Sequence, residues 1–286
     1  MQSRNPVFTR ADGFNGRAAG NAHGNTTYPG NGQEYAGYGS PAQWGTGTPG
    51  APTQVDQGRM SIDSVVQKTG ITLGVVILAA AATWLFTGDP TADPQAVTGL
   101  YGLAMAGALG GLVLSLVNSF KKVVSPPLVI GYAALEGLFV GAFSKVLEAT
   151  FGHGLVVGAV LGTMAAVAGT LAAYKFFDIK VGAKFYKFVF GAMIGFVALS
   201  FLDFGLSFFG ASFGFNGFGP MGLLSSAIGL VLGVLMLIMD FDFVERGVAA
   251  GLPERESWRA AFGLTVTIVW IYIELLRILA ILRGND

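Results

Sequence analysis

Seven long apolar segments follow one another between about residues 69 and 282, and they constrain the fold more than any other feature of the sequence. Each has about 17–25 residues, which is enough for a helix to cross a hydrocarbon core of roughly 30 Å. Because no water is present there to satisfy free backbone groups, such segments must be helical. The predicted spans are 69–87, 97–120, 126–144, 153–177, 188–211, 220–244 and 261–282. The sequence therefore predicts an all-α polytopic membrane protein, a seven-transmembrane-helix bundle in contact with the lipid bilayer.

The composition supports this class and excludes several others. Hydrophobic residues make up 52% of the chain and charged residues 12%, whereas a soluble domain carries roughly 25% charged residues. The formal net charge of zero argues against a nucleic-acid partner, which would need a basic patch. The chain has no cysteine, so disulfides and thiolate metal sites are excluded. The two histidines, His23 and His153, are too far apart in sequence to form a zinc motif.

The sequence carries no motif of familiar enzyme chemistry. We find no phosphate-binding Gly-rich loop, no His–Glu metal motif and no serine elbow, and we interpret GFNGFG at 214–219 as an outer loop. Asp203 and Asp240 differ in predicted depth by about 18 Å, too much for the catalytic pair of an intramembrane aspartyl protease. We therefore expect a protein that is not an enzyme and that holds no cofactor.

Residues 1–60 differ in composition from the rest of the chain. They are rich in Gly, Asn, Pro, Thr and Tyr and show no apolar periodicity. Such a segment cannot bury enough surface to offset the entropy lost on ordering. The sequence therefore predicts a disordered cytoplasmic tail at 1–60 and a transmembrane domain at 61–286. The spaced aromatic residues of the tail either dock a partner or belong to a solvated tether.

Small residues recur at four-residue spacing on four of the predicted spans. They are Gly102, Ala106 and Gly110; Gly158 and Gly162; Gly191 and Gly195; and Gly229 and Gly233. This spacing places small side chains on one face of a helix, so that the backbones of neighbouring helices can approach closely. The pattern predicts a compact bundle and names no function.

Basic residues are divided unevenly between the two sides of the predicted bundle. With the N-terminus inside, the outer loops hold only Lys145 and the chain end holds Arg283. The inner side then receives Arg59, Lys68, Lys121, Lys122, Lys175, Lys180, Lys184, Lys187, Arg246, Arg255 and Arg259. The positive-inside rule places the N-terminus in the cytoplasm and the C-terminus outside.

Four acidic residues lie within the predicted spans, on four different helices. At about 1.5 Å of rise per residue, Asp240 lies roughly 5 Å from the cytoplasmic edge, and Glu136, Glu274 and Asp203 lie roughly 15, 20 and 23 Å from it. Arg277 is the one base at comparable depth, and Glu274 precedes it by three residues, so those two can pair. Acids inside a membrane are costly and usually line a proton or cation path, although each can instead bond to a neighbouring helix. We favour a cation pathway.

The stretch 235–248, LMLIMDFDFVERGV, holds acids that are not equivalent. Asp240 and Asp242 are two residues apart and point to opposite sides of a helix, so they cannot act together as a two-carboxylate claw. Asp242 precedes Arg246 by four residues, which predicts an ion pair at the rim. Asp240 has no base near it in sequence. Its predicted place at the C-terminal end of the helix, where the dipole disfavours negative charge, suggests a site that responds to pH near neutrality.

Three stretches carry a resemblance to a known family. They are SPPLVIGYAALEGLFVGAFS in the third span, MDFDFVERG in the sixth and AFGLTVTIVWIYIELLRILAIL in the last. Through them the chain, over roughly residues 65–283, resembles the Bax-inhibitor-1 (TMBIM/YccA-like) membrane proteins. The Gly- and Tyr-rich tail and the long sixth-to-seventh link are similar to those of actinobacterial members.

The resemblance implies a seven-helix bundle around a central last helix, in the plasma (inner) membrane. In the best-understood bacterial members it implies a pH-sensitive calcium leak, latched by two aspartates that share a proton. Asp240 matches the first aspartate, and Gly247 follows at the family's spacing. The expected position of the second is Thr267, which cannot carry a charge, and Glu274 lies about 10 Å further along the same face. The shared-proton latch therefore cannot exist here in its usual form.

Two functions follow from these observations. The first is a cation leak with Ca²⁺ or H⁺ as the permeant or sensed ion, gated at Asp240 and lined by Glu136, Glu274 and Asp203. The second, implied by other family members, is a non-conducting regulator of a membrane-bound AAA protease or of a stress or cell-death response through protein contacts. Acids that converge on one lumen favour the first function, and acids that each bond to a neighbouring helix favour the second.

Overall fold

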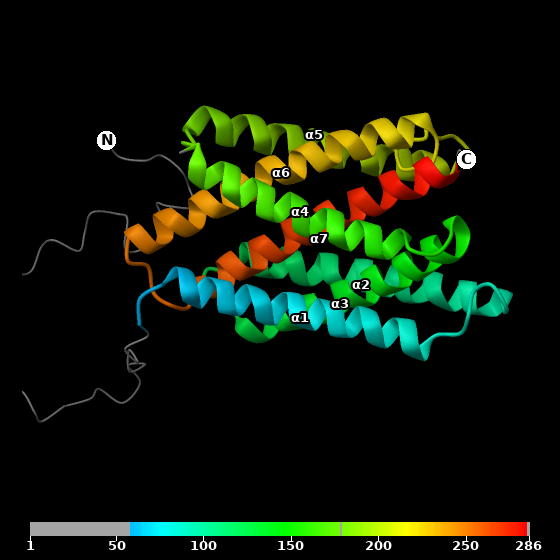
Figure 1. The fold of residues 1–286 in the computed structure, drawn as a ribbon, viewed down its shortest axis with the longest axis horizontal. Helices are drawn as coiled ribbons and strands as arrows, with labels where there is room; N and C mark the ends of the chain where they lie inside the picture. The colour runs from blue at the N-terminus through cyan, green and yellow to red at the C-terminus, as the bar shows by residue number, and fades with distance from the viewer. Residues whose placement is uncertain (1–57, 178, 285–286) are drawn as a thin grey trace, which may run out of the picture. The chain divides into compact units, whose positions relative to one another are not determined.

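Seven α-helices run along roughly one shared axis in the computed structural model, which describes residues 58–284 except Asp178 (Figure 1). Their bounds are α1 Ile62–Phe86, α2 Pro94–Phe120, α3 Pro126–Phe151, α4 Leu155–Phe176, α5 Ala183–Ser207, α6 Pro220–Ala249 and α7 Glu256–Gly284. All seven are long and apolar enough to cross a membrane. The prediction of an all-α, multi-pass membrane protein is confirmed for this part of the chain.

Several helices continue beyond the apolar runs that predicted them. At the start of α1, Ser61 and Ser64 form a reciprocal capping box, so the helix begins seven residues before the predicted span. The α6 helix continues to Ala249, which leaves Asp240 about 14 Å from its end at the usual helical rise. Because the helix dipole acts mainly within the last turn, the expectation that it affects Asp240 is wrong.

The folded part of the chain begins earlier than the predicted boundary at residue 60. The backbone amide of Met60 donates to the Leu252 carbonyl at 2.7 Å, and that of Glu254 donates to the Gly58 carbonyl at 2.8 Å. The Met60 side chain is buried in the same apolar cluster as Leu237 and Leu264. Residues 58–60 therefore belong to the bundle. The rest of the predicted tail, 1–57, lies outside the described residues.

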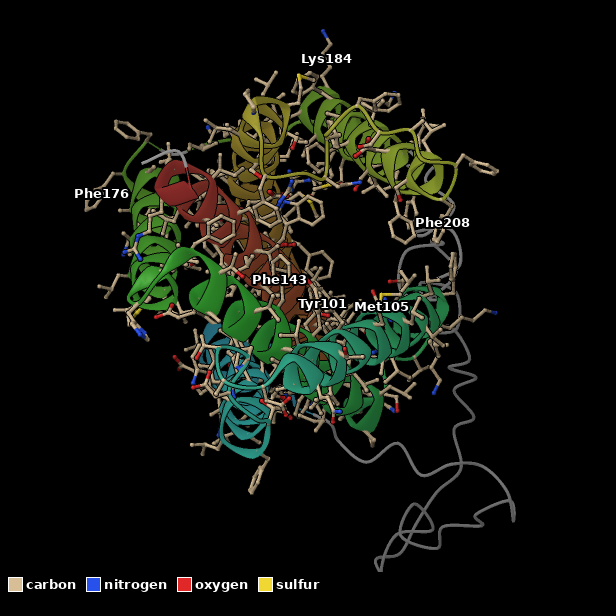
Figure 2. All side chains as sticks on the ribbon, turned by 90° about the vertical axis from the view of Figure 1, so that its right-hand side faces the viewer. Tyr101, Met105, Phe143, Phe176, Lys184 and Phe208 are labelled. Atoms are coloured by element: carbon tan, nitrogen blue, oxygen red, sulfur yellow. The ribbon has the colours of Figure 1, made fainter. Side chains whose placement is uncertain are left out.

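The last helix occupies the centre of the bundle. Within the described residues, the backbone of α7 packs closely against α1, α3, α4 and α6, whereas that of α2 approaches only α3 and that of α5 approaches only α6. Phe196 of α5 also packs edge-on against Trp270 of α7, with 5.5 Å between ring centroids. The end-on view shows α7 inside the ring of the other helices, with α2 and α5 at the periphery (Figure 2). This arrangement confirms the central last helix that the resemblance implies. It also leaves large faces of α2 and α5 for contact with lipid.

The tightest contact between helices joins α1 to α3 at two glycines. A Cβ atom on Gly137 would lie 2.4 Å from the Val76 carbonyl oxygen, and one on Gly141 would lie 2.6 Å from the Ala80 carbonyl oxygen. These glycines are four residues apart, on one face of α3. Neither was among the small residues that the sequence analysis selected.

The selected small residues have mixed outcomes. Four of them approach side chains of α7: Gly158, Gly162, Gly229 and Gly233. On α2, Gly110 faces Leu135 of α3, whereas Gly102 faces open space. On α5, a Cβ atom built on Gly191 or on Gly195 would also meet nothing within 4 Å. The prediction that these last two pack against another helix is wrong, because α5 contacts α6 through a different face.

We expect Gly137→Ala to destabilise the bundle and Gly195→Ala to leave it intact. The new methyl group at Gly137 would meet the α1 backbone, and such overpacking costs about 1–3 kcal/mol. The same change at Gly195 meets open space and should gain about 0.5–1 kcal/mol of helix propensity. Thermal unfolding of both variants in detergent measures the difference. Equal midpoints for the two variants would contradict the tight α1–α3 contact.

Candidate functional site

A hydrogen bond between Asp240 and Thr267 joins α6 to α7. The Thr267 hydroxyl donates to Oδ2 of Asp240 at 2.6 Å, and the threonine is only 2% exposed. One turn earlier on α7, Gly263 lies next to the same carboxylate, since a Cβ atom there would be in van der Waals contact with Asp240 Oδ1 at 3.4 Å. Among the described residues, no base forms an ion pair with Asp240. A neutral hydroxyl thus faces Asp240 from the position where the resemblance expects a second aspartate.

Asp242 lies on a different face of α6 and serves a different contact. Arg246 Nε lies 2.9 Å from Asp242 Oδ2 and 3.0 Å from Oδ1, as the four-residue spacing predicts. The Tyr186 hydroxyl of α5 donates to the same carboxylate at 3.3 Å, and Arg246 also donates to the Val181 carbonyl. Asp242 and Arg246 therefore fasten α6 to the start of α5. The carboxylates of Asp240 and Asp242 have no partner in common.

Glu274 forms the predicted pair with Arg277. Arg277 Nη1 lies 3.3 Å from Glu274 Oε2, and both side chains are almost completely buried. The glutamate lies directly against Gly229 of α6, where a Cβ atom would be 2.6 Å from Oε1. Arg277 also donates to the Phe215 carbonyl at 3.1 Å. The pair therefore connects α7 to α6 and to the loop that precedes it.

Asp203 holds the loop between α5 and α6. Its carboxylate accepts from the backbone amides of Phe213 at 2.7 Å and Asn216 at 2.9 Å, and from the Ser212 hydroxyl at 3.0 Å. Backbone amides that follow a helix need such acceptors when they are shielded from water. Asp203 is 3% exposed, and both of its oxygens are occupied. Its arrangement is that of a loop anchor.

Glu136 lies at the contact between α2 and α3. Its Oε2 would be 3.2 Å from a Cβ atom on Gly111 of α2, so the glycine makes room for the carboxylate. One turn earlier, the Tyr132 ring packs edge-on against Phe262 of α7, with 5.0 Å between ring centroids. Glu136 is only half-buried.

The four predicted pathway acids do not form one site. In residues 58–284, without Asp178, no group of three or more His, Asp or Glu side chains is arranged to hold a metal ion. Asp240, Glu274 and Asp203 are each bonded to a separate partner. Their chemistry in this conformation is to hold helices and loops together.

Sequence reasoning missed one buried cation at the opposite end of the bundle from Asp240. Lys145 was counted only as an outer-loop base, yet its side chain is buried and lies on α3. Its ammonium donates to the carbonyls of Trp84 and Thr87 at 2.8 Å each, and to the Thr87 hydroxyl at 2.9 Å. It thus satisfies the free carbonyls at the end of α1. In the sequence, the one sign of this role was that Lys145 is the single lysine on the predicted outer side.

Comparison with known proteins agrees with this architecture. A family model described as Bax inhibitor 1 like matches residues 5–284, a longer stretch than the 65–283 over which the resemblance was seen. An uncharacterized protein of Chlamydia muridarum (strain MoPn / Nigg) is 30% identical over 166 residues, which cover 55% of this chain and 67% of the relative. Together with the central α7 and the seven spans, the match identifies the chain as a member of the Bax inhibitor 1 like family.

Proposed function

We propose that this protein is a cation leak of the plasma (inner) membrane, calcium by family resemblance, which is closed in this conformation. The observation that carries the proposal is the 2.6 Å bond from Thr267 to Asp240. It stands where related proteins are expected to have their two-aspartate latch. The aspartate keeps its place, and a hydroxyl takes the role of the second carboxyl group.

Opening requires α6 and α7 to separate at the Asp240–Thr267 bond. Asp240 forms no ion pair with any described base, so a freed carboxylate would be available to a passing cation. Hard cations such as Ca²⁺ prefer carboxylate and carbonyl oxygens. A single carboxylate binds weakly, which suits a pathway from which the ion must also leave.

The other three acids differ in how strongly they would attract a cation in this proposal. Glu136 is half-buried and has no ion-pair partner among the described residues, so it is the second acid of the pathway. The charge of Glu274 is offset by Arg277, which makes it a weaker attraction for cations. Asp203 is bound to its loop, and we assign it to structure instead of the pathway.

Acidification should loosen this gate. A hydroxyl that donates to an ionised carboxylate forms a bond about twice as strong as one to a neutral acid. Protonation of Asp240 therefore weakens its bond to Thr267, and the leak should rise as pH falls. With one titrating acid in place of a coupled pair, the response should be shallow.

A second candidate function is a non-conducting regulator that acts through protein contacts, with a membrane-bound AAA protease as the partner implied by resemblance. The observation in its favour is that Asp240, Glu274 and Asp203 are each bonded within the bundle. Co-purification of a protease from native membranes, with no calcium flux in liposomes at any pH, would select this function over the leak.

We expect Thr267→Val to raise calcium flux into liposomes about tenfold at neutral pH, and Asp240→Asn to remove the pH dependence of flux. The first change deletes the hydroxyl donor of a bond worth about 1.5–3 kcal/mol, and the second deletes the titrating group. Glu245→Gln is the matched control, because this exposed acid on α6 accepts from Tyr174 of α4 and from no other described side chain. If Thr267→Val conducts like wild type and Asp240→Asn keeps its pH profile, the bond is not the gate.

Thr267→Asp should make the dependence of flux on pH steeper than in wild type. The change places two carboxyl groups at the site of the 2.6 Å contact, and two such groups titrate as a coupled pair. Flux measured in small pH steps between mildly acidic and neutral pH reveals the slope. An unchanged slope would mean that position 267 does not face Asp240 during gating.

We expect the α6–α7 link to be cytoplasmic and the α1–α2 loop to face outward. Because the chain has no cysteine, single cysteines at Ala250 and Asp89 can be labelled selectively. In intact cells an impermeant thiol reagent should label Asp89→Cys and spare Ala250→Cys, following the distribution of basic residues. The reverse pattern would invert the proposed orientation.

A further inference from the structure

An open surface cavity of about 350 Å³ lies at the end of the bundle where α1, α3 and α7 begin. It is lined by Lys68, Pro126, Glu254, Arg255 and Trp258. We call it the basic cavity. None of its lining residues belongs to the proposed cation pathway. Two of them are basic, whereas the pathway residues are acidic.

The lining acid of the basic cavity is already neutralised. Lys68 Nζ lies 2.6 Å from Glu254 Oε1, and the ammonium is buried 5.8 Å from the centre of the Trp258 ring. Arg255 is different, because only its Nε is engaged, donating to the Val124 carbonyl at 2.9 Å. Its two terminal nitrogens donate to no described residue. A guanidinium held in this way presents two parallel donors, the geometry that recognises phosphate.

The neighbouring α2–α3 loop adds further positive charge. Arg259 donates to the Lys122 carbonyl at 2.9 Å and so holds the loop against the start of α7. The Lys121 and Lys122 ammonium groups are exposed and bond to no described residue. The cavity and the segments beside it carry five basic and two acidic side chains, which gives a formal excess of three positive charges. The basic group consists of Lys68, Lys121, Lys122, Arg255 and Arg259, and the acidic group of Glu254 and Glu256.

Apolar surface adjoins this charge. Phe120, the last residue of α2, is 84% exposed, and Val123 in the α2–α3 loop is 51% exposed. Trp258 lies at the cavity itself, and tryptophan is typical of the membrane–water interface. A ligand that satisfies both surfaces carries an anionic head and apolar chains.

We propose that the basic cavity binds the phosphate of an anionic phospholipid. The terminal nitrogens of Arg255 and the ammonium groups of Lys121 and Lys122 contact the phosphate, while the acyl chains lie along Phe120 and Val123. Basic pockets between helices at the cytoplasmic side of membrane proteins suit such headgroups. This site is independent of the cation leak, because it shares no residue with the Asp240–Thr267 bond.

The test uses the purified full-length protein and native mass spectrometry to count bound phosphatidylglycerol against bound phosphatidylcholine. We expect wild type to prefer phosphatidylglycerol. Lys121→Gln with Lys122→Gln should weaken its binding by about fivefold per residue, and Arg255→Gln should weaken it by at least as much. The exposed loop lysines form no side-chain hydrogen bond or ion pair with described residues, so their double variant tests the proposal even if Arg255→Gln misfolds.

Lys184→Gln is the matched control, since this exposed lysine begins α5 and points away from the bundle (Figure 2). It should keep wild-type binding. Equal losses in the control and the loop variant would overturn the proposal in favour of general surface charge. Equal binding of the two lipids would also overturn it. Displacement of phosphatidylglycerol by millimolar inorganic phosphate would show that the cavity holds free phosphate, and the lipid assignment would be wrong.

Discussion

The bundle depends on one constraint, which is that polar groups must be satisfied away from water, and at its centre α7 meets this need. Unpaired polar groups are costly inside a membrane, and α7 carries a polar side chain toward nearly every helix it touches. Its bonds join Thr265 to Thr72 of α1, Tyr272 to Ser144 of α3, Thr267 to Asp240 of α6, Trp270 to the Gly229 carbonyl of α6, and Arg277 to the Phe215 carbonyl before α6. These bonds fix the positions of α1, α3 and α6 relative to the last helix.

The proposed gate at Asp240 is compatible with this arrangement, because the other contacts of α7 hold the bundle together. Hydrogen bonds between membrane helices contribute about 0.6 kcal/mol on average, and a bond to a charged acceptor contributes about 1.5–3 kcal/mol. The bond to Asp240 is one of several that α7 makes, so its loss does not separate the helices everywhere. Among the α7 bonds, the one to Asp240 combines an ionisable acceptor with the absence of an ion-pair partner in the described residues. Further along α7, Trp270 and Glu274 continue to hold α6. Movement at Asp240 can therefore occur as a local hinge.

The same constraint explains why acids on four helices do not create a preformed ion site. A buried carboxylate is stable in a membrane when donors surround it or a base offsets it. Asp203 obtains its donors from the loop amides of Phe213 and Asn216, and Glu274 obtains its base from Arg277. Asp203 therefore stabilises its loop, and Glu274 stabilises the contact between α7 and α6. Asp240 and Glu136 are left without an ion-pair partner among the described residues.

The sequence by itself determined the seven spans, the family and the contacts that lie along a single helix. Glu274 with Arg277 and Asp242 with Arg246 were predictable, because 3.6 residues per turn fixes which side chains share a face. Only the tertiary structure decided which neighbour each face meets. It placed Gly137 of α3 against the α1 backbone, left Gly195 of α5 without a neighbour, and turned Asp203 toward its own loop. Periodicity carries no information about packing between helices, since that depends on side chains far apart in the chain meeting in space.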